Sequence, residues 1–117
     1  MPKTYPSWTI TSIEWSSGME KIIIHPGEIL KCEFLEPLEI TDYALAKAIG
    51  VQQTRISMIV KGERSITVDT ALRLGRFFNT SPEFWMNLQN RYDRLTLEEQ
   101  YGEEFNRIRP CSLVLAA

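Results

Sequence analysis

The segment 40–62, ITDYALAKAIGVQQTRISMIVKG, limits the possible folds of this chain more than any other segment. Gly50 stops a first short helix, because glycine enters the left-handed conformation at a helix C-terminus without steric penalty. The Thr41 hydroxyl can cap the start of that helix, and Gln52 can cap a second helix that Gly62 ends. Helices this short are marginal in isolation, so the segment predicts two helices that pack on each other and on a larger core.

Four small or branched residues in this segment have the spacing of a helix-turn-helix motif. Ala46 lets the two helices approach closely, and Gly50 makes the sharp turn between them. Ile56 and Ile59, three residues apart, pack the second helix onto the first. The alternative interpretation is an ordinary helical hairpin in any bundle. Because all four positions agree at once, we interpret the pair as a DNA-binding motif.

The geometry of the motif predicts which side chains contact DNA. The second helix enters the major groove with its N-terminal end, and the first helix crosses the DNA backbone. Gln53 is the predicted base reader, since its amide can bind adenine through two hydrogen bonds. Met58 could also contact a base, at a thymine methyl. Three residues are suited to either a base or a phosphate: Thr54, Arg55 and Ser57. The candidates for phosphate contact are Gln52, Lys61 and Arg64. The alternative for each is an ordinary solvated side chain.

Three further helices are expected around the motif, joined by short connections without a strand-rich region. The first begins at Pro26, where a missing N–H is harmless, and ends at Pro37. Thr67 caps a helix that runs over about 68–78. Ser81, followed by proline and glutamate, marks the start of the last helix. The expected fold class is therefore all-α, with five helices.

The C-terminal part of the chain predicts one more short helix. Thr96-Leu97-Glu98-Glu99 has the form of a capping box, so we expect a new helix from Thr96 to about Arg107, although Gly102 weakens it. Trp85, in the preceding helix, is expected to anchor the core under the first helix.

Composition excludes several functional classes. The chain has 117 residues and is 44% hydrophobic, which suffices for one modest core. No apolar run is long enough to span a bilayer, and no secretory signal is expected, so a cytoplasmic location is predicted. His25 is the single histidine and has no ligating or nucleophilic neighbour, so a local capping role is expected. Cys32 and Cys111 have no metal-ligand spacing, and no cofactor, metal or catalytic centre is predicted.

Charge is distributed unevenly along the chain. The net charge is −2, which disfavours nonspecific binding to nucleic acid by the whole molecule. Arg55, Lys61 and Arg64 nevertheless make the second motif helix locally basic. The segment 98–104 holds four glutamates and no basic residue. We therefore expect weak DNA binding by a monomer and stronger binding by a dimer.

Longer phrases extend the pattern beyond the motif. They are HPGEIL (25–30), FLEPLEIT (34–41), LAKAIGV (45–51), ITVDTALRLGRFFNTSPEFW (66–85) and MNLQNRYD (86–93). Together they strongly resemble HigA/VapI-type antitoxins of the XRE, lambda-repressor-like helix-turn-helix class, over roughly residues 22–95. The resemblance implies a dimeric antitoxin of a type II toxin–antitoxin module. It also implies neutralisation of a RelE-like, HigB-type toxin that cleaves mRNA, and binding to operator DNA to repress the protein's own operon.

The resemblance suggests three regions and leaves alternatives open. Residues 1–21 are expected to be a flexible N-terminal extension, 22–95 the helix-turn-helix domain, and 96–117 a C-terminal extension available for dimer or partner contact. The alternatives are a stand-alone transcriptional repressor without a toxin partner and a toxin-binding protein with weak DNA affinity.

Overall fold

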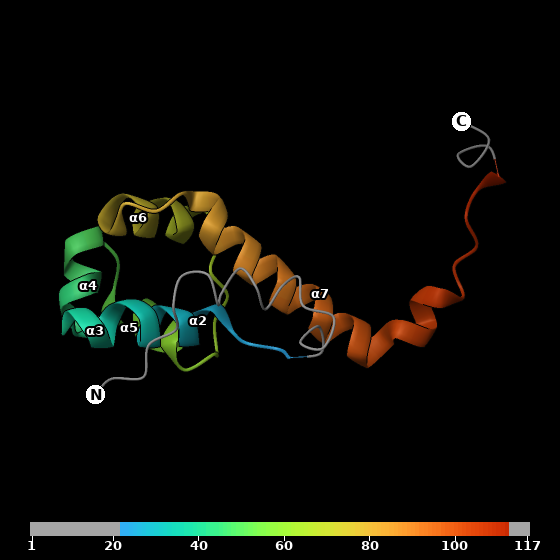
Figure 1. Cartoon of the computed structure of the whole chain (residues 1–117), viewed down its shortest axis with the longest axis horizontal. Coiled ribbons are helices and arrows are strands. Elements are labelled where there is room, and N and C mark those ends of the chain that lie inside the picture. The colour runs from blue at the N-terminus through green and yellow to red at the C-terminus, as the bar shows by residue number, and fades with distance from the viewer. Residues whose placement is uncertain (1–21, 113–117) are drawn as a thin grey trace.

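The computed structural model describes residues 22–112, and every regular element in this range is helical (Figure 1). The elements are α2 (Pro26–Ile29), η2 (Leu30–Leu35), α3 (Glu36–Leu38), α4 (Asp42–Ile49), α5 (Gln53–Val60), α6 (Val68–Phe78) and α7 (Pro82–Asn106). Because α2, η2 and α3 follow one another without a break, they form one helical run. With α4 to α7 this makes five helical units, which confirms the predicted all-α class.

The first helical run begins as expected but ends later. Pro26 occupies its first turn, and the Gly27 N–H donates to His25 Nδ1 at 2.9 Å. The predicted local role of His25 is thus confirmed. The predicted end at Pro37 is wrong, since the run continues to Leu38 and stops at Glu39, which has φ 55°. Pro37 lies inside this run, directly after the π-helical segment η2, whose C-cap residue Glu36 donates its N–H to the Lys31 carbonyl.

The caps of α4 and α5 follow the predicted turn chemistry, with one exception. The Ala44 N–H donates to Thr41 Oγ1 at 3.0 Å, and Gly50 ends α4 with φ 75°. Gln52 stands at the N-cap of α5, but its side chain makes no capping hydrogen bond, in line with the preference for shorter side chains there. Helix α5 ends at Val60, and Gly62, with φ 80°, turns the chain two residues later.

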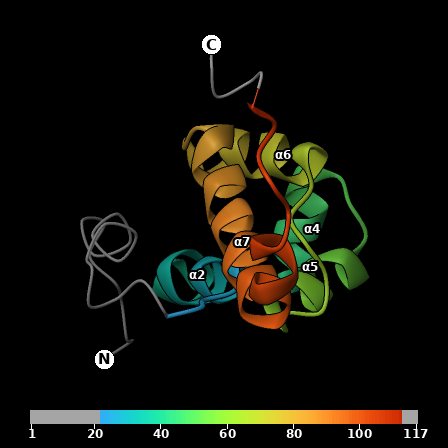
Figure 2. The ribbon, with the colours of Figure 1, turned by 90° about the vertical axis from the view of Figure 1, so that its right-hand side faces the viewer.

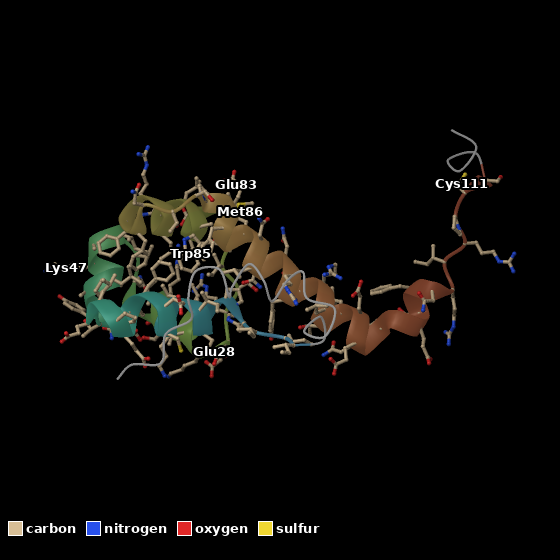
Figure 3. All side chains as sticks on the ribbon, viewed as in Figure 1. Glu28, Lys47, Glu83, Trp85, Met86 and Cys111 are labelled. Carbon is tan, nitrogen blue, oxygen red and sulfur yellow. The ribbon has the colours of Figure 1, made fainter. Side chains whose placement is uncertain are left out.

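Aromatic packing joins the first helical run to α6 and α7. Trp85 is fully buried in the interior of the bundle (Figure 3). Its ring lies 5.0 Å from the Phe34 ring, centroid to centroid, and its Nε1 donates to Thr80 Oγ1 at 2.8 Å. Phe34 also packs against Phe78 at 4.7 Å. The prediction that Trp85 anchors the core beneath the first helix is confirmed.

Helix α7 is longer than predicted. It runs unbroken through Thr96, so the expected new helix start there is wrong. The side chains of a capping box compete with the helical hydrogen bonds but do not by themselves end a helix. Here Thr96 lies inside the helix, and the i, i+4 ion pair of Arg94 with Glu98, at 3.1 Å, joins the turns before and after it. The discontinuity lies instead at Tyr101, with φ −130° and ψ 17°, directly before Gly102. Figure 1 shows the second half of α7 leaving the bundle.

We expect Gly27→Ala to destabilise the fold. A Cβ at position 27 would lie 1.7 Å from the Ile59 carbonyl oxygen, so α2 and α5 would have to separate. Overpacking of this kind costs about 1–3 kcal/mol. Gly102→Ala is the matched control, because a Cβ there meets nothing within 4 Å and alanine favours a helix by up to about 1 kcal/mol. Urea unfolding of both variants measures the difference; equal stability would contradict the expected clash.

We expect stability to fall in mild acid through His25. Burial lowers the pKa of His25, and the charge of Asp93 partly opposes this effect. The unfolded chain therefore binds a proton at His25 more readily than the folded protein does. The stability that neutral His25 contributes is complete above the unfolded pKa of about 6.5, and it is lost as the pH falls through the lower pKa of the folded protein. His25→Asn retains a capping acceptor without titrating there. The melting temperature of the variant should depend less on pH between about 7.5 and 5; parallel curves would refute the linkage.

Candidate nucleic-acid interface

Helix α5 is held to the body of the protein by one side only. Ile56 and Ile59 are fully buried in the core that also contains the α4 residues Leu45 and Ala46, and α5 packs on α4. The turn between α4 and α5 is closed by the Val51 N–H, which donates to the Ala46 carbonyl at 3.0 Å. Residues of α5 that lie away from this buried stripe consequently face outward, and α4 and α5 lie together on one flank of the bundle (Figure 2).

The start of α5 is open to solvent. Gln52, Gln53 and Thr54 are all exposed, as are Lys61 and Arg64 just beyond its C-terminal end. Two amides and a hydroxyl thus stand at the helix N-terminus, where the helix dipole is positive. Two cations lie at the other end of the same element. This arrangement is suited to a groove lined by base edges and bordered by phosphates.

Three further predicted DNA contacts are partly withdrawn from solvent. Arg55 Nη1 donates to Asp69 Oδ2 at 2.8 Å and to Thr70 Oγ1 at 3.4 Å. Ser57 Oγ donates to Asp42 Oδ2 at 3.1 Å, and Met58 is half-buried. The sequence pattern did not anticipate these partners, because each lies 14 or 15 residues away along the chain.

Asp69 links the three helices that surround the candidate interface. It accepts from Arg55 on α5 and from Arg73 Nε on its own helix at 3.0 Å. Arg73 Nη1 also donates to the Ile49 carbonyl at the end of α4 at 2.8 Å. The hydrogen bonds from Arg55 and Arg73 lower the pKa of Asp69. The network therefore ties the orientation of α5 to both α4 and α6.

Helix α4 contributes two residues that the sequence reasoning missed. Tyr43 is 57% exposed in its first turn, and Lys47 Nζ lies 5.9 Å from the centre of the Tyr43 ring. Figure 3 shows Lys47 at the outer edge of the bundle. The available sequence signal was the i, i+4 spacing of an aromatic and a cation on the helix that crosses the DNA backbone. Both residues are candidates for phosphate contact.

A metal site and a membrane span have requirements of their own, with which the described residues can be compared. Within residues 22–112, no three His, Cys, Asp or Glu side chains are grouped so that they could hold a metal ion. None of the helices in that range is long and apolar enough to cross a membrane.

Comparison with known proteins identifies the class of this fold. The helix-turn-helix family model matches residues 33–85, which span η2 to the start of α7. Virulence-associated protein I of Dichelobacter nodosus is 48% identical over 89 residues, which cover 76% of this chain and 82% of the relative. Antitoxin HigA-1 of Vibrio cholerae is 39% identical over 84 residues, which cover 72% of this chain and 79% of that protein.

A solved structure supports the same assignment. The structure of Pseudomonas aeruginosa antitoxin HigA with the higBA promoter is 45% identical and superposes with a TM-score of 0.72. The match covers 74% of this chain and 96% of the other. The chain therefore belongs to the HigA/VapI-type antitoxins, a non-enzymatic family of the XRE, lambda-repressor-like helix-turn-helix class.

Proposed function

We propose that this protein binds operator DNA through α5 and represses its own operon. The observation that carries the proposal is the exposed start of α5, with Gln53 and Thr54 at its tip and Lys61 and Arg64 beyond its end. A HigA relative has been solved with its promoter, which supports the same use of the motif here. Phosphate contacts position such a helix, and base contacts give it sequence preference.

The side chains divide the task by chemistry. Gln53 reads adenine through its amide, while Thr54 contacts a base or a phosphate. Lys61 and Arg64 pair with phosphates, and Gln52 donates to a phosphate from the helix cap. Tyr43 and Lys47 hold the backbone from α4. The remaining predicted contacts act after local rearrangement: Arg55 and Ser57 exchange Asp69 and Asp42 for DNA, and Met58 meets a thymine methyl.

A dimer is the expected binding unit. The net charge of −2 makes a single copy a poor general ligand for DNA. Two copies related by a two-fold axis present two α5 helices to the half-sites of a palindrome. Doubling the number of base and phosphate contacts compensates for the weak attraction of each copy, so affinity for an operator should rise steeply with dimerisation.

The second part of the proposed function is neutralisation of a toxin. The relatives named as HigA antitoxins support a toxin partner. The resemblance to HigA/VapI-type antitoxins implies that this partner is a RelE-like, HigB-type toxin that cleaves mRNA, and we place both proteins in the cytoplasm. We assign DNA binding to residues 22–95. Residues 96–117 provide a C-terminal extension for dimer or partner contact. The predicted flexible N-terminal extension, residues 1–21, lies outside the described residues.

The acidic net charge favours a second candidate function, a toxin-binding protein with weak DNA affinity. Gel shift with the DNA upstream of this gene, with and without the product of the neighbouring reading frame, separates the candidates. A salt-sensitive, sequence-selective shift supports the repressor. Toxin binding without such a shift supports the second candidate. A selective shift with no toxin binding would show a stand-alone repressor.

We expect Gln53→Ala to relax base preference at one operator position. Loss of an amide that forms two hydrogen bonds with adenine should reduce discrimination there by about 1–3 kcal/mol. The measurement is competition binding across a set of operators with single base-pair changes. Gln100→Ala replaces an exposed glutamine on α7 and should leave the preference unchanged. Wild-type preference in Gln53→Ala would show that another face of α5 reads the bases.

We expect Arg64→Ala to weaken binding to every sequence. Because a phosphate contact releases a counterion, its removal should lower the slope of log K against log salt by about 1. Arg76→Ala is the control, since Arg76 is an exposed arginine on α6 outside the proposed contact set. Titrations at several salt concentrations give the slope. An unchanged slope in Arg64→Ala would remove this residue from the interface.

A further inference from the structure

Arg55, in the first turn of α5, already has a partner within the protein. Its Nη1 donates to Asp69 Oδ2 at 2.8 Å and to Thr70 Oγ1 at 3.4 Å. Asp69 stands in the first turn of α6, so this ion pair joins the two helices. The Arg55 side chain is 28% exposed and the Asp69 side chain is 55% exposed. Arg55 therefore lies next to the predicted base contacts at the start of α5, but its guanidinium is bound to α6.

The two groups that hold Arg55 each have a second partner. Asp69 Oδ2 also accepts from Arg73 Nε at 3.0 Å. The buried hydroxyl of Thr70 also accepts from Thr67 Oγ1 at 3.3 Å. A buried polar group or a carboxylate that loses its last partner destabilises a protein. Because both groups keep a partner when Arg55 leaves, the protein can release Arg55 without that cost.

Buried packing carries most of the support of α5. Ile56 and Ile59 are fully buried, whereas the ion pair of Arg55 with Asp69 is partly exposed. Exposed ion pairs contribute little to stability, and burial of an isoleucine side chain contributes more. Loss of the ion pair should therefore leave α5 in place and change mainly what Arg55 can bind.

We infer that Asp69 is a specificity-determining residue, because it competes with DNA for Arg55. The inference rests on the proposed function, in which Arg55 leaves Asp69 for DNA. Guanine gives Arg55 two hydrogen bonds in the operator, but binding it breaks the ion pair within the protein. Only the difference between the two free energies adds to affinity. At a wrong base Arg55 returns to Asp69, so the wrong base is penalised less than it would be without this carboxylate.

The variant Asp69→Asn tests the sign of this effect. It keeps the size of the side chain and removes the charge that holds Arg55. Operator affinity should therefore rise at least about twofold, and preference for guanine at one base pair should increase by a similar factor. If Asp69 acted only as a support for α5, the same variant would bind more weakly and with relaxed preference.

Glu83→Gln is the matched control. Glu83 is also an exposed carboxylate in the first turn of a helix, but it lies on α7, away from Arg55 in the sequence and outside the proposed contact set. The control should keep the wild-type affinity and base preference. The measurement is fluorescence anisotropy of the full-length protein with the DNA upstream of its gene, and with duplexes that carry single base-pair changes.

A double-variant cycle separates competition from simple charge repulsion. Removing a carboxylate near DNA favours phosphate binding even if Arg55 does not move. In an Arg55→Met background, Asp69→Asn removes the same charge but has no arginine to release. The gain in affinity should therefore disappear in that background. A gain of equal size in both backgrounds would show repulsion alone and would overturn the inference.

The remaining outcomes separate the inference from the proposed function. If the wild type does not distinguish the operator from a scrambled duplex of the same length, the proposed function is wrong and the inference is overturned with it. If the wild type is selective but Asp69→Asn binds like Glu83→Gln, operator recognition stands and the inference is overturned. Weaker operator binding by Asp69→Asn, with or without a lower melting temperature, would show a supporting role and would also overturn it.

Discussion

The close approach of α2 to α5 at Gly27 is the contact on which the reading helix depends. Only a residue without a Cβ leaves space for the Ile59 carbonyl at this point. Ile56 and Ile59 are fully buried, and α5 contacts both α2 and α4. Helix α5 has only eight residues, too few to be stable without such packing. Because this packing fixes the buried side of α5, it also sets the direction in which the exposed side of α5 faces.

A polar network completes this support at the surface. Asp69 joins Arg55 of α5 to Arg73, which in turn reaches the last carbonyl of α4. Exposed ion pairs add little to stability individually, but this one connects three helices around the candidate DNA contact. Arg55 therefore has two possible uses, one within the protein and one toward DNA. The local sequence suggested only the second of these.

The start of α5 and the second half of α7 have different physical characters. The start of α5 is polar and carries nearby cations, as a phosphate-lined groove requires. The second half of α7 holds four glutamates and exposed apolar side chains, which are unsuited to such a groove. Extending one helix beyond the core separates these surfaces, because nothing in the described bundle covers its far half. The acidic net charge of the chain is therefore compatible with a DNA-binding end.

Local chemistry in the sequence determined the helix starts at Pro26, Thr41, Thr67 and Ser81, because caps and turns depend on residues a few positions apart. The same local logic failed at Thr96, where the capping box lies within a continuous helix. Rules that use only neighbouring residues cannot predict contacts between residues that are distant in the chain. Only the tertiary structure decided that Asp69 holds Arg55, that Gly27 meets Ile59, and that α7 leaves the bundle, since each depends on how helices pack in space.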